Sequence, residues 1–308
     1  MHFNYKINSD ERGLALITVL LIVAILTTLV TDFIYRSYIT TSRAANFRDS
    51  ARASLLARDG VTLARAGLEE LIKKDPNLVM DATGMVFSKT VAEGLQIDVR
   101  AIDERSRVSA RIAYPLTGVI EPKAHGSYGR LLKAVRISDE SLVDALADWI
   151  DNDSAPRARG AEEHYYKALS TPYKPRNNYL ESVDELRLIK GYNNDVLKTI
   201  GQYVTPYNPD GLVNINTAQK PVLMSLTDEM TEALADGIIT FRSGTPFKDR
   251  SDVMKVHGFE RVGFSLQDRI TTTSNAYRVF SRASAGEVVR EVEAVIQLGG
   301  GVLYWREM

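Results

Sequence analysis

The sequence contains no cysteine, which excludes disulfide bonds, thiolate metal ligands and a cysteine nucleophile. It has only 4 histidines, at positions 2, 125, 164 and 257, and none is spaced to share a metal ion with another. Basic and acidic residues nearly balance, 38 against 39, so no global field favours nucleic acid. A glycine-rich phosphate loop and a nucleophile–base signature are also missing. The sequence therefore predicts no enzyme, no nucleic-acid partner and no small-molecule substrate.

Charge is missing from one long segment near the N-terminus. Residues 14–31 form an uncharged apolar stretch ended by Asp32. As a helix rising about 1.5 Å per residue, this stretch would span about 27 Å, close to the hydrocarbon thickness of a bilayer. A buried core helix could share this composition, but it would need an unusually large apolar surround. The stretch therefore predicts a single membrane-spanning helix.

The flanks of this stretch differ from those of a secretory signal, which ends in small residues at its cleavage site. Here Arg12-Gly13 precedes the apolar stretch instead, so cleavage after Gly13 would retain it as an anchor. Proline is absent from residues 14–75, and Pro76 supplies a stop. Apolar residues then recur at steps of three and four, at positions 57, 61, 64, 68 and 71. One helix is predicted over residues 14–75, membrane-embedded first and docked on a soluble domain afterwards.

The N-terminus resembles that of type IV prepilins, with Arg12-Gly13-Leu14 followed by an apolar helix that continues as an amphipathic one. The resemblance implies that prepilin peptidase cleaves between Gly13 and Leu14, leaving residues 1–13 as a cytoplasmic leader. Prepilins usually carry glutamate at the position of Thr18, where it is thought to meet the free amine of a neighbouring subunit. Thr18 cannot form this pair, which suits a tip subunit with none above it, or else an ordinary anchor.

The orientation rests on this resemblance. Arginines at positions 36, 43, 48 and 52 follow the apolar stretch, whereas only Lys6 and Arg12 precede it. Counting positive charges would place the C-terminal side in the cytoplasm. The prepilin-like junction implies the reverse, a single-pass protein of the bacterial inner membrane with its C-terminal domain in the periplasm.

The remaining sequence predicts an α+β fold, in which the long helix packs on a small antiparallel sheet interrupted by a large inserted all-α domain. Strand-like alternation covers residues 95–102, with 107–112 as a continuation, and residues 277–283 and 287–298 predict a hairpin. Residues 302–305 predict an edge strand. Helical patterns occur throughout the inserted segment, and two of them cover residues 141–150 and 230–241. Two more helices are predicted to begin at a capping box formed by Ser182 and Glu185, and at Asn216 with Pro221 in the first turn. We assign residues 76–126 and 267–308 to the pilin-like domain and 127–266 to the insert.

Carboxylates gather directly after the helix predicted at residues 141–150. They belong to Asp148, Asp151, Asp153, Glu162 and Glu163. Hard oxygen ligands in one loop suit calcium, which takes six to eight oxygens, although the spacing is not that of an EF-hand. Solvated carboxylates at a helix end are an equally good interpretation of the residues alone.

A second group of segments resembles helix-hairpin-helix DNA-binding modules. It comprises residues 185–191, 213–218, 241–242 and 254–258. Acidic residues outnumber basic ones between residues 182 and 264, however, and binding through phosphates needs the opposite sign. A protein-packing scaffold is the favoured interpretation, and DNA binding remains the alternative.

Several long motifs in order resemble the minor pseudopilin K family of type II secretion. Residues 148–166 follow a DWxDxDxxPRxxGAExxYY pattern, and matching segments occur at 171–177, 185–191 and 213–218. The resemblance covers residues 12–308. It implies calcium bound by Asp151, Asp153, Glu162 and Glu163, with Asp148 as an outer candidate. It also implies helix bundling with I- and J-type minor pseudopilins to initiate and cap a pseudopilus tip for protein export. A DNA-uptake pseudopilin is the alternative.

Overall fold

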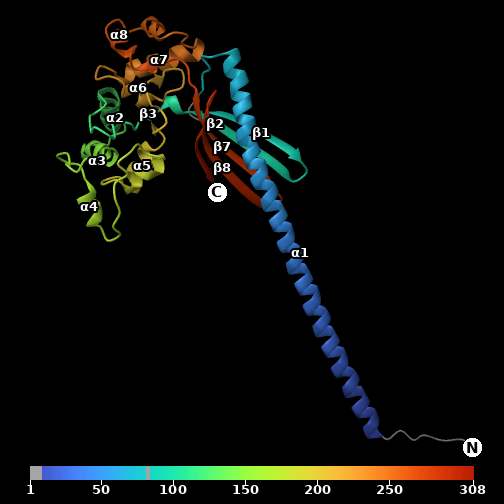
Figure 1. Cartoon of the computed structure of the whole chain (residues 1–308). Coiled ribbons are helices and arrows are strands. Elements are labelled where there is room, and N and C mark those ends of the chain that lie inside the picture. The colour runs from blue at the N-terminus through green and yellow to red at the C-terminus, as the bar shows by residue number, and fades with distance from the viewer. Residues whose placement is uncertain (1–8, 81–83) are drawn as a thin grey trace, which may run out of the picture.

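One long helix projects from a body made of two parts (Figure 1). The computed structural model describes the backbone of residues 9–80 and 84–308, and the side chains from residue 13 onward. The helix, α1 (Ser9–Lys74), runs without interruption through the predicted segment and begins slightly before it. Most of the predicted leader, residues 1–13, lies outside the described residues. The fold is α+β, as the sequence predicts, with the helix packed on a small sheet and a helical insert beside it.

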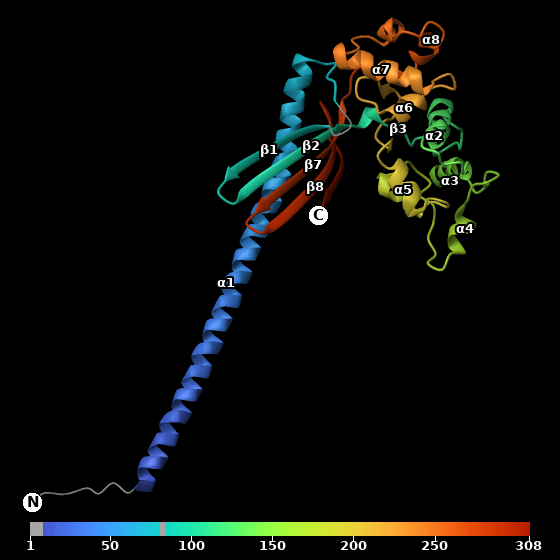
Figure 2. The ribbon, with the colours of Figure 1, turned by 180° about the vertical axis from the view of Figure 1, so that it is seen from behind.

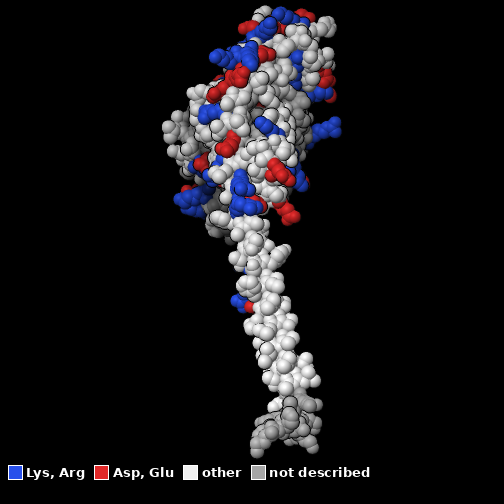
Figure 3. All heavy atoms as spheres, turned by 90° about the vertical axis from the view of Figure 1, so that its right-hand side faces the viewer, with Lys and Arg blue, Asp and Glu red and all other residues white. Residues whose placement is uncertain are grey.

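The first half of α1 contacts nothing else in the described chain. Its apolar segment is long enough to cross a membrane, and none of that segment is buried. Figure 3 shows the outer part of the helix as an almost uncharged rod, whereas charged side chains cover the body. Leu14 and Leu20, for example, are exposed by more than half of their surface, 69% and 59%. Such a surface is stable only against lipid or other apolar helices.

The second half of α1 packs across the sheet, against β2 (Leu95–Asp103), β7 (Ala276–Ala285) and β8 (Val288–Gln297). Ala57, Val61 and Leu68 from the predicted stripe are buried there, whereas Leu71 is exposed. Gly60 is also buried. A Cβ atom at Gly60 would collide with Ser281 and lie 2.6 Å from Ile97 Cδ1, so the glycine permits the close approach of helix and sheet.

The sheet has five antiparallel strands in the order β1-β2-β7-β8-β9, including β1 (Met85–Ala92) and β9 (Val302–Glu307). The predicted hairpin is confirmed as β7 and β8, and the predicted edge strand as β9. Ile97, Val99 and Ala101 of β2 alternate inward, as a half-buried strand requires. Strand β1 was not predicted, and its side chains are almost all exposed.

The insert leaves the sheet at Asp103 and returns at Ala276, and Asp103 pairs with Tyr277 in the register of β2 and β7. Both ends of the insert therefore emerge from neighbouring strands (Figure 2). This exit lies earlier than the predicted boundary after residue 126. Residues 108–109 (β3) do not continue β2, because they form a short parallel pair with β4 (Val204–Thr205).

The insert is helical, with a second short parallel pair, β5 (Val213–Asn214) and β6 (Ile270–Thr271). Its helices are α2 (Pro122–Ala134), α3 (Ser141–Ile150), α4 (Glu163–Lys167), α5 (Asn194–Ile200), α6 (Lys220–Met224), α7 (Glu232–Gly244) and α8 (Gly263–Leu266), with 3-10 turns η1 (Glu104–Ser106), η2 (Val183–Leu188) and η3 (Arg250–Lys255). Its core, which includes Tyr128, Leu146 and Phe247, is separate from the core under α1.

The predicted capping box at Ser182 and Glu185 is wrong. The segment that follows Ser182 is a 3-10 helix, and the Ser182 side chain caps nothing. Instead, the two Glu185 oxygens accept hydrogen bonds from the Glu181 N–H and from Trp149 Nε1, each at 2.9 Å. Glu185 therefore ties this segment to the helix that carries the carboxylate cluster.

Candidate metal centre

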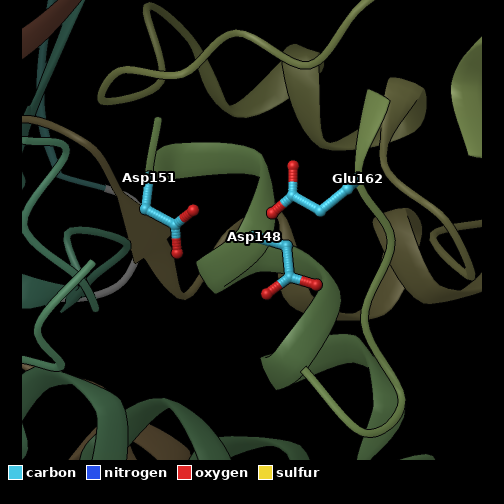
Figure 4. A group of neighbouring side chains, drawn as sticks. All are labelled: Asp148, Asp151 and Glu162. Carbon is cyan, nitrogen blue, oxygen red and sulfur yellow. The ribbon is translucent and has the colours of Figure 1, made fainter. Parts of the chain in front are cut away.

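Three carboxylates meet where α3 ends and α4 begins. Asp148 lies in the last turn of α3, Asp151 is its C-cap residue, and Glu162 is the N-cap residue of α4. One oxygen from each lies within 4.8 Å of the others, and all three side chains are buried (Figure 4). The loop between the two helices, residues 151–162, brings Glu162 back over the end of α3.

Two glycines allow the chain to close around the cluster. A Cβ atom at Gly160 would overlap the Asp148 carboxylate, so only glycine fits at this position, two residues before Glu162. Gly118 has a positive φ of 64°, and a Cβ there would lie 2.9 Å from Asp153 Oδ2. The loop containing Gly118 also packs on the cluster through a hydrogen bond from the Asn152 N–H to the Pro115 carbonyl, 3.0 Å long.

Arg157 is the cation of the cluster. Its Nη1 donates to Asp148 Oδ1 and Asp151 Oδ2, both at 2.5 Å, and its Nη2 donates to the Gly118 carbonyl at 2.8 Å. Its backbone N–H also donates to the Asp148 carboxylate. Sequence reasoning did not assign this role to Arg157, although Pro156-Arg157 belongs to the quoted motif.

One guanidinium does not satisfy three carboxylates. Asp151 Oδ1 and Glu162 Oε1 are buried, and neither has a hydrogen-bond partner among the described residues. Burial and the negative charges of Asp148, Asp151 and Asp153 raise the pKa of Glu162 to about 8. Burial also raises the pKa of Asp151, against the opposing effect of Arg157. The three carboxylates therefore exceed the single positive charge of Arg157, and a hard cation such as calcium fits their oxygen donors.

The other two predicted ligands lie outside this group of three. Asp153 is exposed, and its Oδ1 accepts a hydrogen bond from the Ala155 N–H at 2.8 Å. Glu163 forms ion pairs with Lys167 and Lys174, at 2.6 and 3.1 Å, and these lysines lower its pKa. Asp148, predicted as an outer candidate, is instead fully buried within the cluster.

The predicted cleavage junction lies within α1. The helix continues through Gly13 and Leu14, both exposed. The hydroxyl of Thr18 donates to the Leu14 carbonyl at 2.9 Å, so its hydrogen bond is formed within its own helix.

The segments that resemble helix-hairpin-helix modules direct key polar groups inward. Asn216 is fully buried, and its amide exchanges hydrogen bonds of 2.9 Å with the Phe247 backbone in both directions. Arg242 is also buried, and its Nη1 donates to the Ile215 carbonyl at 2.7 Å. These groups hold the scaffold together, as the packing interpretation requires.

Comparisons with known proteins agree with this architecture. Family models described as "Type II secretion system (T2SS), protein K" match residues 106–209 and 213–273. The chain is 28% identical over 306 residues to type II secretion system protein K of Pseudomonas aeruginosa, with 94% of this chain and 89% of the relative covered. It is 30% identical over 230 residues to the Klebsiella pneumoniae protein K, with 69% and 68% covered.

A similar fold occurs in the crystal structure of the GspK-GspI-GspJ complex from enterotoxigenic Escherichia coli. The TM-score is 0.71 at 19% identity, and the match covers 86% of this chain and 99% of that one. The exposed apolar helix, the sheet on its second half and the helical insert define a pseudopilin-like protein with an enlarged head. More particularly, the chain belongs to the type II secretion system protein K family.

Proposed function

We propose that this chain is a minor pseudopilin that initiates and caps the pseudopilus tip together with I- and J-type minor pseudopilins, in support of protein export. The observation that carries the proposal is the shape of the molecule. An exposed apolar helix can bundle with similar helices, whereas the insert extends sideways from the sheet (Figure 1). A head of this width is hard to repeat along a tightly packed shaft. The similar fold in a GspK-GspI-GspJ complex supports the choice of partners.

The anchor would lie in the inner membrane with the insert and sheet in the periplasm. Prepilin peptidase would remove residues 1–13, leaving Leu14 as the first residue of the membrane-embedded half of α1. The apolar, exposed surface of this half supports a single crossing. Thr18 satisfies its hydroxyl within the helix, so the segment needs no charged partner from a subunit above it.

Calcium would stabilise the insert. Asp148, Asp151 and Glu162 would hold the ion, because their oxygens already converge and two of those oxygens have no hydrogen-bond partner among the described residues. When bound, calcium supplies positive charge that offsets the repulsion between these carboxylates. Arg157 and the glycine at position 160 position the carboxylates for that role.

Three measurements test the assignment. The mass of the membrane-extracted chain should decrease by residues 1–13 only when prepilin peptidase is co-expressed, and an uncut chain would refute the pilin-type anchor. Labelled subunits should then occur at filament ends, in a complex with both other minor pseudopilins. Regular spacing along the shaft would refute the tip position. Salt-dependent DNA binding by the full-length chain would favour the DNA-uptake alternative instead.

A further inference from the structure

A cleft with a volume of about 410 Å³ lies between the sheet and the insert. Its lining includes five arginines and three carboxylates, together with apolar side chains such as Ile102, Leu197 and Phe280. The volume falls within the range of small-ligand sites, about 300–1,000 Å³. The cleft is distinct from the carboxylate cluster, and neither the proposed assembly nor the calcium site uses it.

Three carboxylates around the cleft, those of Glu104, Glu293 and Asp184, form ion pairs with arginines. Arg278 donates from Nε to Glu104 Oε1 at 2.7 Å and from Nη1 to Glu293. Arg306 donates to Glu293 Oε2 at 2.7 Å and to Asp184 Oδ2 at 2.6 Å. Two arginines of the sheet are thus connected by ion pairs to Glu104 and Asp184 of the insert.

Several guanidinium donors in the cleft have no acceptor among the described residues. Arg278 is 5% exposed, and its Nη2 is buried without a hydrogen-bond partner. The Nε atom of Arg306 is also buried and has no hydrogen-bond partner among the described residues. Arg107 is 8% exposed, and the shortest ion-pair contact of its guanidinium is 3.6 Å, from Nη1 to Glu104 Oε1. A buried N–H without an acceptor is costly, so a ligand oxygen that reached these donors would gain favourable hydrogen bonds.

The third lining carboxylate does not neutralise these donors. The Asp103 oxygens accept hydrogen bonds from Asn214 Nδ2 at 2.7 Å and from the Thr217 hydroxyl at 2.6 Å. Burial raises the pKa of Asp103, against the opposing effect of these hydrogen bonds. With five arginines and three carboxylates in its lining, the cleft carries more positive than negative charge.

We propose that this cleft binds a small organic carboxylate, with its oxygens at Arg107, Arg278 and Arg306 and its hydrocarbon part against the apolar side chains of the lining. Guanidinium groups pair with carboxylates in a fixed, bidentate geometry. The apolar side chains in the lining, which include Ile102, Leu197 and Phe280, favour a carboxylate with a hydrocarbon body over inorganic phosphate. The same chemistry is available from a free acid and from the C-terminal residue of a polypeptide. Because Arg278 and Arg306 belong to the sheet and Arg107 to the insert, the ligand would hold these two parts together.

Isothermal titration calorimetry on the full-length chain in a non-ionic detergent would test the proposal. The probes are pentanoate, N-acetyl-leucine, N-acetyl-leucinamide and inorganic phosphate at constant ionic strength. Saturable one-to-one binding is expected for at least one of the two carboxylates, and no binding is expected for the uncharged amide. Tighter binding of N-acetyl-leucine would identify a chain terminus as the source, whereas equal or tighter binding of pentanoate would identify a free acid.

Variants separate the cleft from the general charge of the protein. Arg107→Gln should weaken carboxylate binding about tenfold or more, because it removes a charged donor. Arg282→Gln removes an exposed arginine from β7, the strand that carries Arg278, and should leave the affinity unchanged. Circular dichroism would verify that each variant is folded. Absence of saturable binding to wild-type protein, equal binding of the amide, or equal affinity in Arg107→Gln would overturn the proposal.

Discussion

The helix–sheet part and the insert reach stability in different ways. The helix–sheet part relies on regular alternation, with a small core between α1 and three strands. The insert has the larger core, but its helices are short and its loops depend on particular polar groups, above all Arg157 with its carboxylates. Regular elements tolerate change wherever their pattern survives, whereas a loop held by one charged cluster depends on each member of that cluster.

The two tryptophans allow this difference to be measured. Trp149 is buried in the insert and packs edge-on against Tyr166, with ring centroids 5.1 Å apart. Trp305 lies in β9 of the sheet. Trp305→Phe and Trp149→Phe backgrounds therefore report the insert and the sheet separately by fluorescence.

The largest loss of stability is expected from the substitution Asp151→Ala. It removes one of the two buried carboxylates that pair with Arg157, so that only Asp148 remains, and should lower the free energy of unfolding of the insert by about 3–5 kcal/mol. Denaturant titration monitored at Trp149 would measure the loss, and the transition at Trp305 should remain in place. Asp153→Ala is the matched control, because Asp153 is exposed. Equal effects of the two substitutions would contradict the role of the cluster.

Calcium removal should act on the same part of the molecule. At a free calcium concentration about 100 times the dissociation constant, binding stabilises the folded state by about 2.7 kcal/mol. Chelation should therefore lower the melting temperature reported by Trp149, and Glu162→Gln should reduce the difference. Identical melting with calcium and with chelator would exclude the proposed calcium site.

A smaller loss of stability is expected from a substitution at Gly60, where α1 crosses the sheet. Gly60→Val introduces side-chain atoms against Ser281 and Ile97 and should cost about 1–3 kcal/mol, detected at Trp305. Gly67→Ala is the control, because no atom lies within 4 Å of its added Cβ. It should stabilise the helix by up to about 1 kcal/mol. Destabilisation by both substitutions would indicate that the helix does not dock as described.

A separate effect, spread over several pH units, is a pH dependence of the stability of the chelated protein. Glu162 has a pKa of about 8 in the folded protein, against a usual value of 4.5, so the folded state keeps a proton that the unfolded state has lost. Stability of the insert should therefore fall as pH rises between these values, by at most about 1.4 kcal/mol per unit. Glu162→Gln should flatten the profile measured at Trp149. A profile that rises with pH in wild-type protein and is unchanged in the variant would contradict the raised pKa.

The sequence predicted the regular elements because their patterns are local. Residues 57, 61 and 68 show the buried face of α1, and helix α3 has the predicted bounds. The hairpin of β7 and β8 follows from its alternation and its glycine turn. Strand β1 lacks such a signal, because nearly all its side chains face solvent.

The missed features depend on contacts between distant residues. The exit of the chain at Asp103 is fixed by β3 pairing with β4, almost a hundred residues later in the sequence. Arg157 binds Asp148 and Asp151 and also the Gly118 carbonyl, 39 residues earlier in the sequence. The predicted capping box fails because the Glu185 carboxylate accepts hydrogen bonds from Trp149 Nε1 and the Glu181 N–H. The sequence identified Asp148, Asp151 and Glu162 as candidates but could not separate them from Asp153 and Glu163, because all five lie in one loop region.

The paired positions of Asp103 and Tyr277 make the insert an exchangeable cassette. Because β2 and β7 are adjacent and antiparallel, a short hairpin turn could join them without moving either strand. The sheet and its helix could then keep one geometry while the head between them was enlarged, reduced or replaced. A single pilin-like stalk can in this way carry heads of very different size.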